Sequence, residues 1–161
     1  LHPILRRQRQ MCIRDRLEGD LANFSIRRTD FGKSGFGNAL WYVEFQADSL
    51  NETFTTTTTL YLNNQNQDFE KQLQNDIFLQ HLIKTDVITT VLSSILLSED
   101  DYQFDLSAEY PDDSLGKIIS DWLSSLNVRK DSDLKNITNQ IINEQGIFRR
   151  RCQNLASSKE E

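Results

Sequence analysis

The hydrophobic pattern of this chain changes its period near residue 68. Before that point, in residues 21–28, 40–47 and 54–62, apolar or aromatic residues alternate with polar ones. An alternation of period two, rich in β-branched and aromatic residues, is typical of half-buried strands. The connecting residues 30–38 and 48–53 are short enough for hairpins, so the pattern predicts a three-stranded antiparallel meander.

Beyond residue 68 the apolar residues recur at the spacing of a helix. Asp68 is a suitable N-cap for a first helix and Asp86 for a second. Since no Gly or Pro separates the two segments, one bent helix is an equal alternative. Residues 102–110 return to alternation and predict a further strand, which ends at Pro111.

Two C-terminal helices complete the predicted fold. The apolar residues of 115–126 fall on one helical face, behind the acidic capping start at residues 112–114. The last helix begins near Asp133, and Gly146 either caps or interrupts it. Because sheet-forming and helix-forming segments are partly segregated along the chain, we predict an α+β fold. We expect a single domain over residues 17–155, followed by a flexible tail at 156–161.

Residues 1–16 differ sharply in composition from the rest of the chain. They hold five of the 18 Lys and Arg residues and the single Met, Met11. Back-translation of residues 10–16 gives AGATGTGTATAAGAGACAG, which looks like the transposon end joined to DNA fragments in shotgun library preparation. A basic transit peptide or nucleic-acid-binding arm is the alternative. We expect a translated sequencing adapter from a metagenomic assembly, with the native N-terminus missing.

The charge of the remaining chain is strongly negative. Without the five arginines and the aspartate of residues 1–16, 13 Lys and Arg stand against 23 Asp and Glu, a net charge of −10 instead of −6. This charge disfavours nucleic acids and anionic membranes as partners, and it suits a basic protein partner or simply solubility. The lone Cys152 of this region cannot form an internal disulfide, and no apolar run reaches the length of a membrane span. A reducing, cytoplasmic compartment is the simplest interpretation, and an acidic secreted bacterial protein without disulfides is the alternative.

The glycine-rich segment 31–37, with the sequence FGKSGFG, resembles a phosphate-binding loop only in part. A P-loop needs a glycine where Arg27 stands, and it needs a helix directly after the loop where this chain predicts a strand. The segment is therefore interpreted as a flexible hairpin loop. Phe31 and Phe36 are expected to be partly exposed on it, which would also suit a recognition loop.

Catalytic and metal-binding patterns are weak in this sequence. Outside residues 1–16, His81 is the single histidine, and no paired His or Cys motif of a zinc site occurs. A nucleophilic pair of Cys152 and His81 rests on one residue of each type and carries little weight. We therefore predict no catalytic residues, no cofactor and no metal.

These observations favour a non-enzymatic protein–protein interaction module, similar in kind to a small acidic adaptor, inhibitor or chaperone. Two alternatives stay open, an accessory domain of a larger enzyme and a structural subunit of a phage-like assembly. Aromatic residues near the hairpins and the acidic pair before residue 115 are the candidate contacts. The predicted binding residues are Phe31, Lys33, Phe36, Trp41, Tyr61, Asp112 and Asp113.

Overall fold

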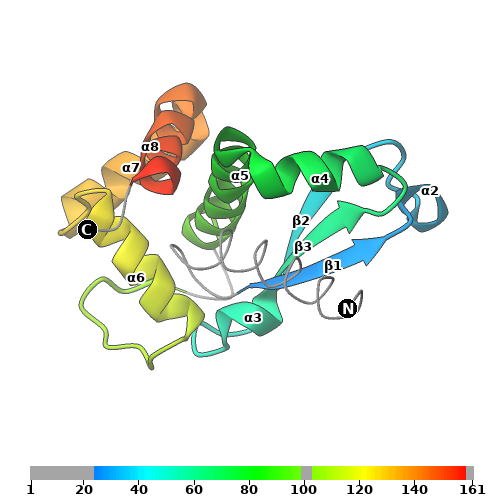
Figure 1. Cartoon of the computed structure of the whole chain (residues 1–161). Coiled ribbons are helices and arrows are strands. Elements are labelled where there is room, and N and C mark those ends of the chain that lie inside the picture. The colour runs from blue at the N-terminus through cyan, green and yellow to red at the C-terminus, as the bar shows by residue number, and fades with distance from the viewer. Residues whose placement is uncertain (1–23, 99–102, 159–161) are drawn as a thin grey trace.

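The computed structural model describes residues 24–98 and 103–158, in which a three-stranded sheet is combined with seven helices (Figure 1). The mixture of strands and helices predicted from the sequence is therefore confirmed, while the interpretation of residues 1–16 lies outside the described residues. The strands are β1 (Ser25–Thr29), β2 (Trp41–Phe45) and β3 (Thr58–Asn63). The helices are α2 (Phe31–Ser34), α3 (Phe54–Thr57), α4 (Gln67–Asn75), α5 (Ile77–Leu96), α6 (Leu115–Ser125), α7 (Asp131–Asn143) and α8 (Gln145–Ser157).

The sheet is mixed, so the predicted antiparallel meander is wrong in part: β2 and β3 pair as predicted, but β1 does not pair with β2. The strand order is β1-β3-β2, with β3 parallel to β1 and antiparallel to β2. The predicted first hairpin does not form, because the connection between β1 and β2 folds into α2 and a loop with positive φ at Gly35 and Gly37. This connection separates the two strands, and β3 pairs between them.

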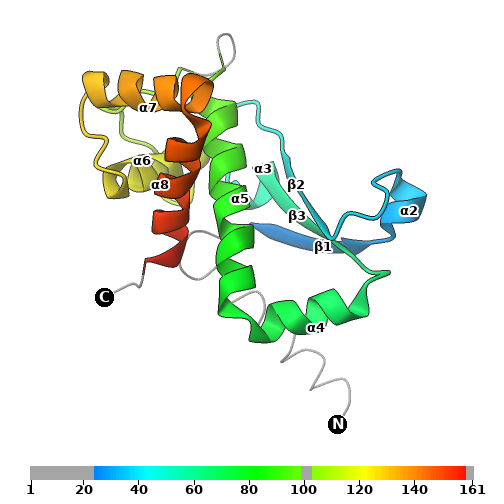
Figure 2. The same cartoon turned by 90° about the horizontal axis from the view of Figure 1, so that it is seen from above.

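One face of the sheet packs against α5 to form the core. Alternate side chains of the strands, including Val43, Leu60 and Leu62, are buried on this face. Helix α5 lies between the sheet and α8, so it contributes to the core on both sides (Figure 2). Its buried apolar residues are Ile83, Val87, Ile88, Val91, Leu92 and Ile95.

The bend in the long helical segment occurs at Asp76, ten residues before the predicted Asp86. The Asp76 carboxylate accepts hydrogen bonds from the amides of Phe78 and Leu79, which starts α5. The Gln80 side chain donates to the Leu73 carbonyl at 2.8 Å, which satisfies an acceptor left open at the end of α4. A side-chain cap thus breaks this helix without Gly or Pro.

Two of the predicted capping residues have other positions. Asn66 caps α4 through the amide of Phe69, and Asp68 lies in the first turn, where its charge complements the helix dipole. Asp86 is inside α5, and its carboxylate accepts a hydrogen bond from the indole of Trp41. Local sequence cannot distinguish a capping aspartate from one in the first turn or in a tertiary contact.

Residues 103–110 do not form the predicted strand. Their side chains alternate between half-buried and exposed as expected, but none of these residues pairs with the described sheet. The segment is held by its own ring contacts, since Phe104 stacks on Tyr110 with centroids 5.7 Å apart. The Tyr110 hydroxyl accepts the amide of Asp105 at 3.0 Å. The alternation of polar and apolar residues therefore predicts the burial of these side chains correctly, but it does not indicate a strand here.

The ends of three other elements differ from the sequence prediction. The strand expected from residue 54 begins only at Thr58, because Thr53 caps the short helix α3 in front of it. The last helical segment is divided at Glu144, and Gly146 lies inside the first turn of α8. Helix α8 runs to Ser157 with Ala156 buried, so it extends into the residues expected to be a tail. None of the described helices is long and apolar enough to cross a bilayer.

Candidate interaction surface

The face of the sheet opposite α5 carries a cluster of three aromatic rings, of which Phe36 and Tyr42 are exposed and Tyr61 is half-buried. Tyr42 of β2 and Tyr61 of β3 are partners in the antiparallel ladder, with ring centroids 6.1 Å apart. Phe36, from the loop after α2, contacts both rings, with centroids 5.1 Å from Tyr42 and 6.4 Å from Tyr61. Phe36 is 39% exposed and Tyr42 is 41% exposed. These three residues are called the aromatic surface below.

The loop that carries Phe36 is held in place by a buried ring and by side-chain hydrogen bonds. Phe31 is completely buried and meets the Phe36 ring edge to face at a centroid distance of 5.3 Å. The Asn63 amide group donates to the Ala39 carbonyl at 3.0 Å, and its oxygen accepts the Phe31 amide at 3.5 Å. Gly35, at φ 80°, provides the left-handed turn that ends α2. The rings are therefore held in place before any partner binds.

Polar groups border the aromatic surface. Arg27 of β1 is the ladder partner of Tyr61 and is exposed, while Glu44 follows Tyr42 on the same face of β2. Burial raises the pKa of Tyr61, and the negative charge and hydrogen bond of Glu44 raise it further. The phenol thus stays protonated and donates to the carboxylate. Ring area, a paired phenol and charges of both signs suit a contact surface.

The structure brings together only part of the predicted site. Phe36 and Tyr61 belong to the aromatic surface, Phe31 supports it, and Lys33 is exposed on α2 close to it in sequence. Trp41 points to the opposite face of the sheet, where it stacks on Phe69 at a centroid distance of 5.8 Å.

Asp112 and Asp113 lie at the other end of the fold. Both are exposed in the turn before α6, far along the sheet from α2 (Figure 1). Asp113 has a φ of 63°, and its carbonyl accepts the Phe54 amide at 3.4 Å. Ser114, which follows, is the buried N-cap of α6 and bridges to Thr53. The two aspartates therefore belong to a structural turn, with their carboxylates left to the solvent side.

Two exposed features, one in the aromatic surface and one outside it, were not anticipated from the sequence. Tyr42 shares the outward side of its strand with Glu44, and that outward position is the signal that identifies it. Ile77, Phe78 and Leu82 are expected on the buried face of a helix but are 53%, 78% and 56% exposed. These three residues lie on the outward side of α5, whereas Gln80 and Ile83 of the same segment are buried.

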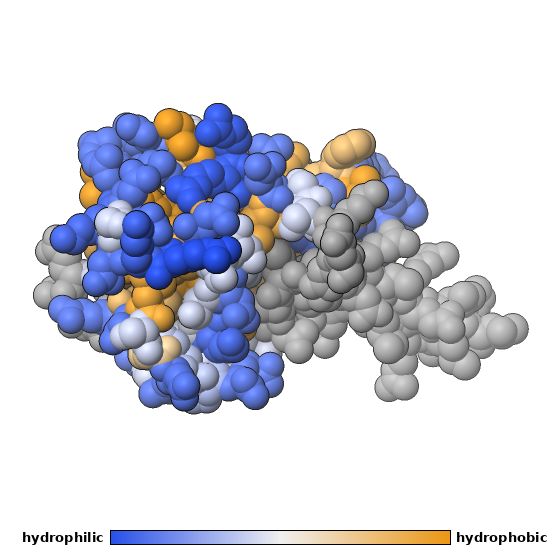
Figure 3. Space-filling model, turned by 90° about the vertical axis from the view of Figure 1, so that its left-hand side faces the viewer, coloured by the Kyte–Doolittle hydropathy of each residue, from blue (hydrophilic) through white to orange (hydrophobic). Residues whose placement is uncertain are grey.

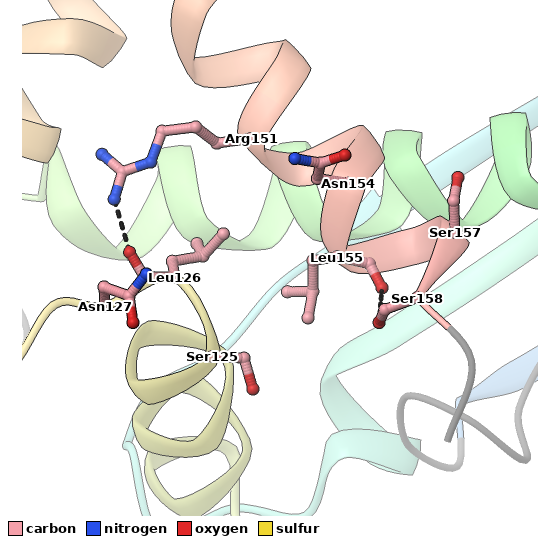
Figure 4. A pocket seen from close by; sticks show the side chains of 8 residues that line it. All are labelled: Ser125, Leu126, Asn127, Arg151, Asn154, Leu155, Ser157 and Ser158. Atoms are coloured by element: carbon pink, nitrogen blue, oxygen red, sulfur yellow. Dashed lines mark hydrogen bonds between the residues drawn. The ribbon is translucent and has the colours of Figure 1, made fainter. Parts of the chain in front are cut away.

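A groove separates the C-terminal end of α6 from α8 (Figure 4). It has a volume of about 770 Å³ and is open to solvent, with mostly small polar side chains around it. The Arg151 guanidinium lies at its edge, where it donates to the Leu126 carbonyl and, at 2.9 Å, to Gln140. Because the positive charge of Arg151 complements the carbonyl end of α6, this side chain has a structural role. The lining residues are Ser125, Leu126, Asn127, Arg151, Asn154, Leu155, Ser157 and Ser158.

The candidate catalytic residues Cys152 and His81 lie on different helices, α8 and α5. Cys152 is fully buried, and this burial raises the pKa of its thiol to about 11, so the nucleophilic thiolate is disfavoured. His81 is half-buried on α5, where its carbonyl accepts from the Thr85 hydroxyl at 2.7 Å. Within residues 24–98 and 103–158, no three His, Cys, Asp or Glu side chains are grouped closely enough to hold a metal ion.

The surface over the C-terminal helices is mainly hydrophilic, with small apolar areas between the polar side chains (Figure 3). This contrasts with the aromatic residues exposed on the sheet. No family model matches the sequence, and comparisons with curated proteins and with solved structures give no significant match. The functional argument therefore depends on the chemistry of the described surface.

Proposed function

We propose that this chain is a non-enzymatic protein-interaction module, which binds an apolar segment of a protein partner on the aromatic surface. The observation that carries the proposal is the convergence of Phe36, Tyr42 and Tyr61 from separate segments onto one open face. Rings fixed in this way lose little conformational freedom on binding, and tyrosine is enriched among residues that dominate interface energies. The buried support under Phe36 favours binding with little rearrangement.

The negative charge of the chain indicates that the apolar segment of the partner is flanked by basic residues. The net charge is −6 for the whole chain and −10 without residues 1–16, so a partner with basic residues around its apolar contact is favoured. Asp112 and Asp113 lie away from the rings and would act through long-range attraction. Their reversal to lysine should slow association at low salt and leave dissociation unchanged.

Because the partner is not identified, selection from a library of displayed random peptides tests whether the chain binds apolar peptide segments. The full chain is used as bait, and enriched peptides are measured again with the Tyr42→Ala variant. Tyr42 is 41% exposed and tolerates truncation better than a core residue. Loss of a central ring costs about 2 kcal/mol, so the affinity should fall about 30-fold.

A matched control uses an aromatic residue that is exposed elsewhere. Phe78 is 78% exposed on α5, and Phe78→Ala removes a ring outside the aromatic surface. Peptides that bind through the proposed site should keep their affinity for this variant. Peptides that lose affinity only with Phe78→Ala would move the docking site to α5 and contradict the proposal.

Thermal unfolding with a panel of small ligands provides the opposing test. A metal, nucleotide, sugar or short nucleic acid that binds the folded chain would stabilise it by about 2.7 kcal/mol at a hundredfold excess over its dissociation constant. We expect no saturable change in melting temperature across this panel. A saturable increase that survives in Tyr42→Ala would indicate a separate ligand pocket and would argue against a purely protein-binding role.

A further inference from the structure

Strand β2 forms one edge of the sheet. It pairs with β3 on one side, and none of the described residues forms a strand on its other side. Figure 2 shows β2 along the margin of the described fold. An edge strand of this kind offers its outer backbone groups to another chain.

The hydrogen bonds to β3 determine which groups point outward. The Asn63 amide donates to the Leu40 carbonyl at 3.1 Å, and the Gln46 amide donates to the Thr57 carbonyl at 2.9 Å. In an antiparallel ladder, residues alternate between facing their neighbour and facing away from it. The even-numbered residues of β2 therefore bond to β3, and the amides and carbonyls of Trp41, Val43 and Phe45 point to the free side.

The sequence of β2 does not protect this edge. Natural sheets often block their edges with charged residues, especially lysine, with proline or with a bulge. Strand β2 reads WYVEF, has Glu44 as its single charge, and pairs with β3 in continuous register. β-Branched and aromatic residues also have a high strand propensity. The edge is thus suited to accept one more strand.

We infer that β2 pairs in antiparallel fashion with β2 of a second copy of this chain, centred on Val43, to form one continuous six-stranded sheet. In this register Val43 faces Val43 of the second copy. Trp41 faces Phe45, and Tyr42 faces Glu44. All outward amides and carbonyls of the two strands then have partners.

The strand is complementary to itself in this register. On the open face each phenol of Tyr42 lies opposite a carboxylate of Glu44, so the two like charges are not directly opposed. A carboxylate has several acceptor positions, and Glu44 can accept a second hydrogen bond while it holds Tyr61. This hydrogen-bond complementarity between Tyr42 and Glu44 selects a second copy as the occupant of the edge. The inference depends on strand pairing and not on the proposed function.

Sedimentation velocity of the full chain at increasing concentration tests the pairing. We expect a change from monomer to dimer, favoured by salt because both copies are acidic. Val43→Pro removes one outward amide, and proline is accepted at edge positions whose amide is not used within the sheet. This variant should fold and remain monomeric. Tyr42→Pro, which removes an amide bonded to β3, should instead unfold.

The opposite edge supplies the matched control. The Asn64 amide donates to the Thr29 carbonyl, so the odd-numbered residues of β1 face β3 and the Ile26 amide points outward. Ile26→Pro should therefore keep the dimer. Loss of the dimer in both proline variants would show that β2 is not the specific contact, and a dimer retained by a cooperatively folding Val43→Pro variant would overturn the inference.

Disulfide trapping decides the register even if Val43→Pro fails to fold. In a Cys12→Ser background, where Cys152 is fully buried, chains with Tyr42→Cys are mixed with chains carrying Glu44→Cys. In the proposed register Tyr42 and Glu44 of the second copy form a non-hydrogen-bonded pair, whose Cα atoms are about 4.5 Å apart and within disulfide range. Diagonal pairs, at about 7–8 Å, are out of range. The mixture should form a cross-linked dimer and each variant alone should not. Absence of the mixed cross-link, or a monomer at every concentration, would contradict the inference.

Discussion

Replacement of Gly116 by alanine tests whether residues 103–113 pack as described. Gly116 is buried in the first turn of α6, and its amide donates to the Leu50 carbonyl at 2.9 Å. A Cβ atom at this position would lie 2.3 Å from Cδ1 of Tyr110 and 2.5 Å from its Cγ. Both distances are shorter than any normal contact, so the ring or the helix must shift.

Two opposing effects determine the size of the change. An alanine in place of glycine normally stabilises a helix by up to about 1 kcal/mol. Overpacking of a filled site costs about 1–3 kcal/mol, and three atoms of the Tyr110 ring are within 3 Å of the added carbon. The ring also stacks on Phe104, which limits its movement. We therefore expect a net loss of about 1–2 kcal/mol in the free energy of unfolding.

Urea unfolding of the full chain measures this loss, with Gly146→Ala as the control. Gly146 is also in the first turn of a helix, but an added Cβ meets nothing within 4 Å, so its replacement should be neutral or stabilising. In a Tyr110→Ala background the Gly116→Ala change should no longer destabilise, which gives a coupling energy in a double-mutant cycle. A Gly116→Ala variant as stable as the wild type would refute the packing of Tyr110 on α6.

Two further predictions concern the core. Burial raises the pKa of the Cys152 thiol from 9.0 to about 11, so its contribution to stability is complete below pH 9, and about 2–3 kcal/mol of stability is lost as the pH rises to 11. Stability curves of Cys152→Ser should lack this decrease, and an equal decrease in both proteins would exclude the thiol as its source. Trp41→Phe keeps the ring on Phe69 but removes the 2.9 Å hydrogen bond to Asp86, with an expected loss of about 1 kcal/mol. If the loss is the same in an Asp86→Ala background, the hydrogen bond contributes nothing.

The amphipathic elements were predictable because their burial follows from local spacing. The α6 residues Leu115, Ile119 and Leu123 are fully buried on one face, behind the cap provided by Ser114. The approximate positions of the strands around Val43 and Leu60 follow in the same way from alternation. In both kinds of element one face packs against the core, and the spacing of apolar residues along the sequence shows which face that is.

The antiparallel pairing of β2 with β3 was predictable, but the parallel pairing of β1 with β3 was not, because it depends on how the connections pack. A short connection favours a hairpin between consecutive strands. Here Phe31 is buried beneath Phe36, and Asn63 of β3 binds both ends of the connecting loop. These contacts join residues far apart in sequence. Local pattern therefore identified the strands and one of their two pairings, but not the position of β3 between β1 and β2.

The same limit explains the mixed outcome for the candidate surface. Phe36 and Tyr61 were identified as aromatic residues near predicted turns, and the structure places them in contact. Trp41 met the same criterion but occupies the core side, since a single step along a strand reverses the face. Tyr42, its neighbour, takes the exposed position. Residue type alone could not distinguish the two, whereas their register could.

The two proposals involve the same strand, and one variant separates them. Pairing at β2 would place the aromatic surfaces of two copies next to each other, because Tyr42 faces Glu44 across the junction. Val43→Pro should then bind a single selected peptide with unchanged affinity, since the side chain of Val43 is buried away from the rings. The same variant should bind a tandem peptide more weakly than the wild type does, because only the dimer offers two adjacent sites to a linked ligand. Isothermal titration with single and tandem peptides measures both values. If Val43→Pro also weakens the single peptide, the docking site extends over the edge of β2 itself, and the two surfaces cannot act independently.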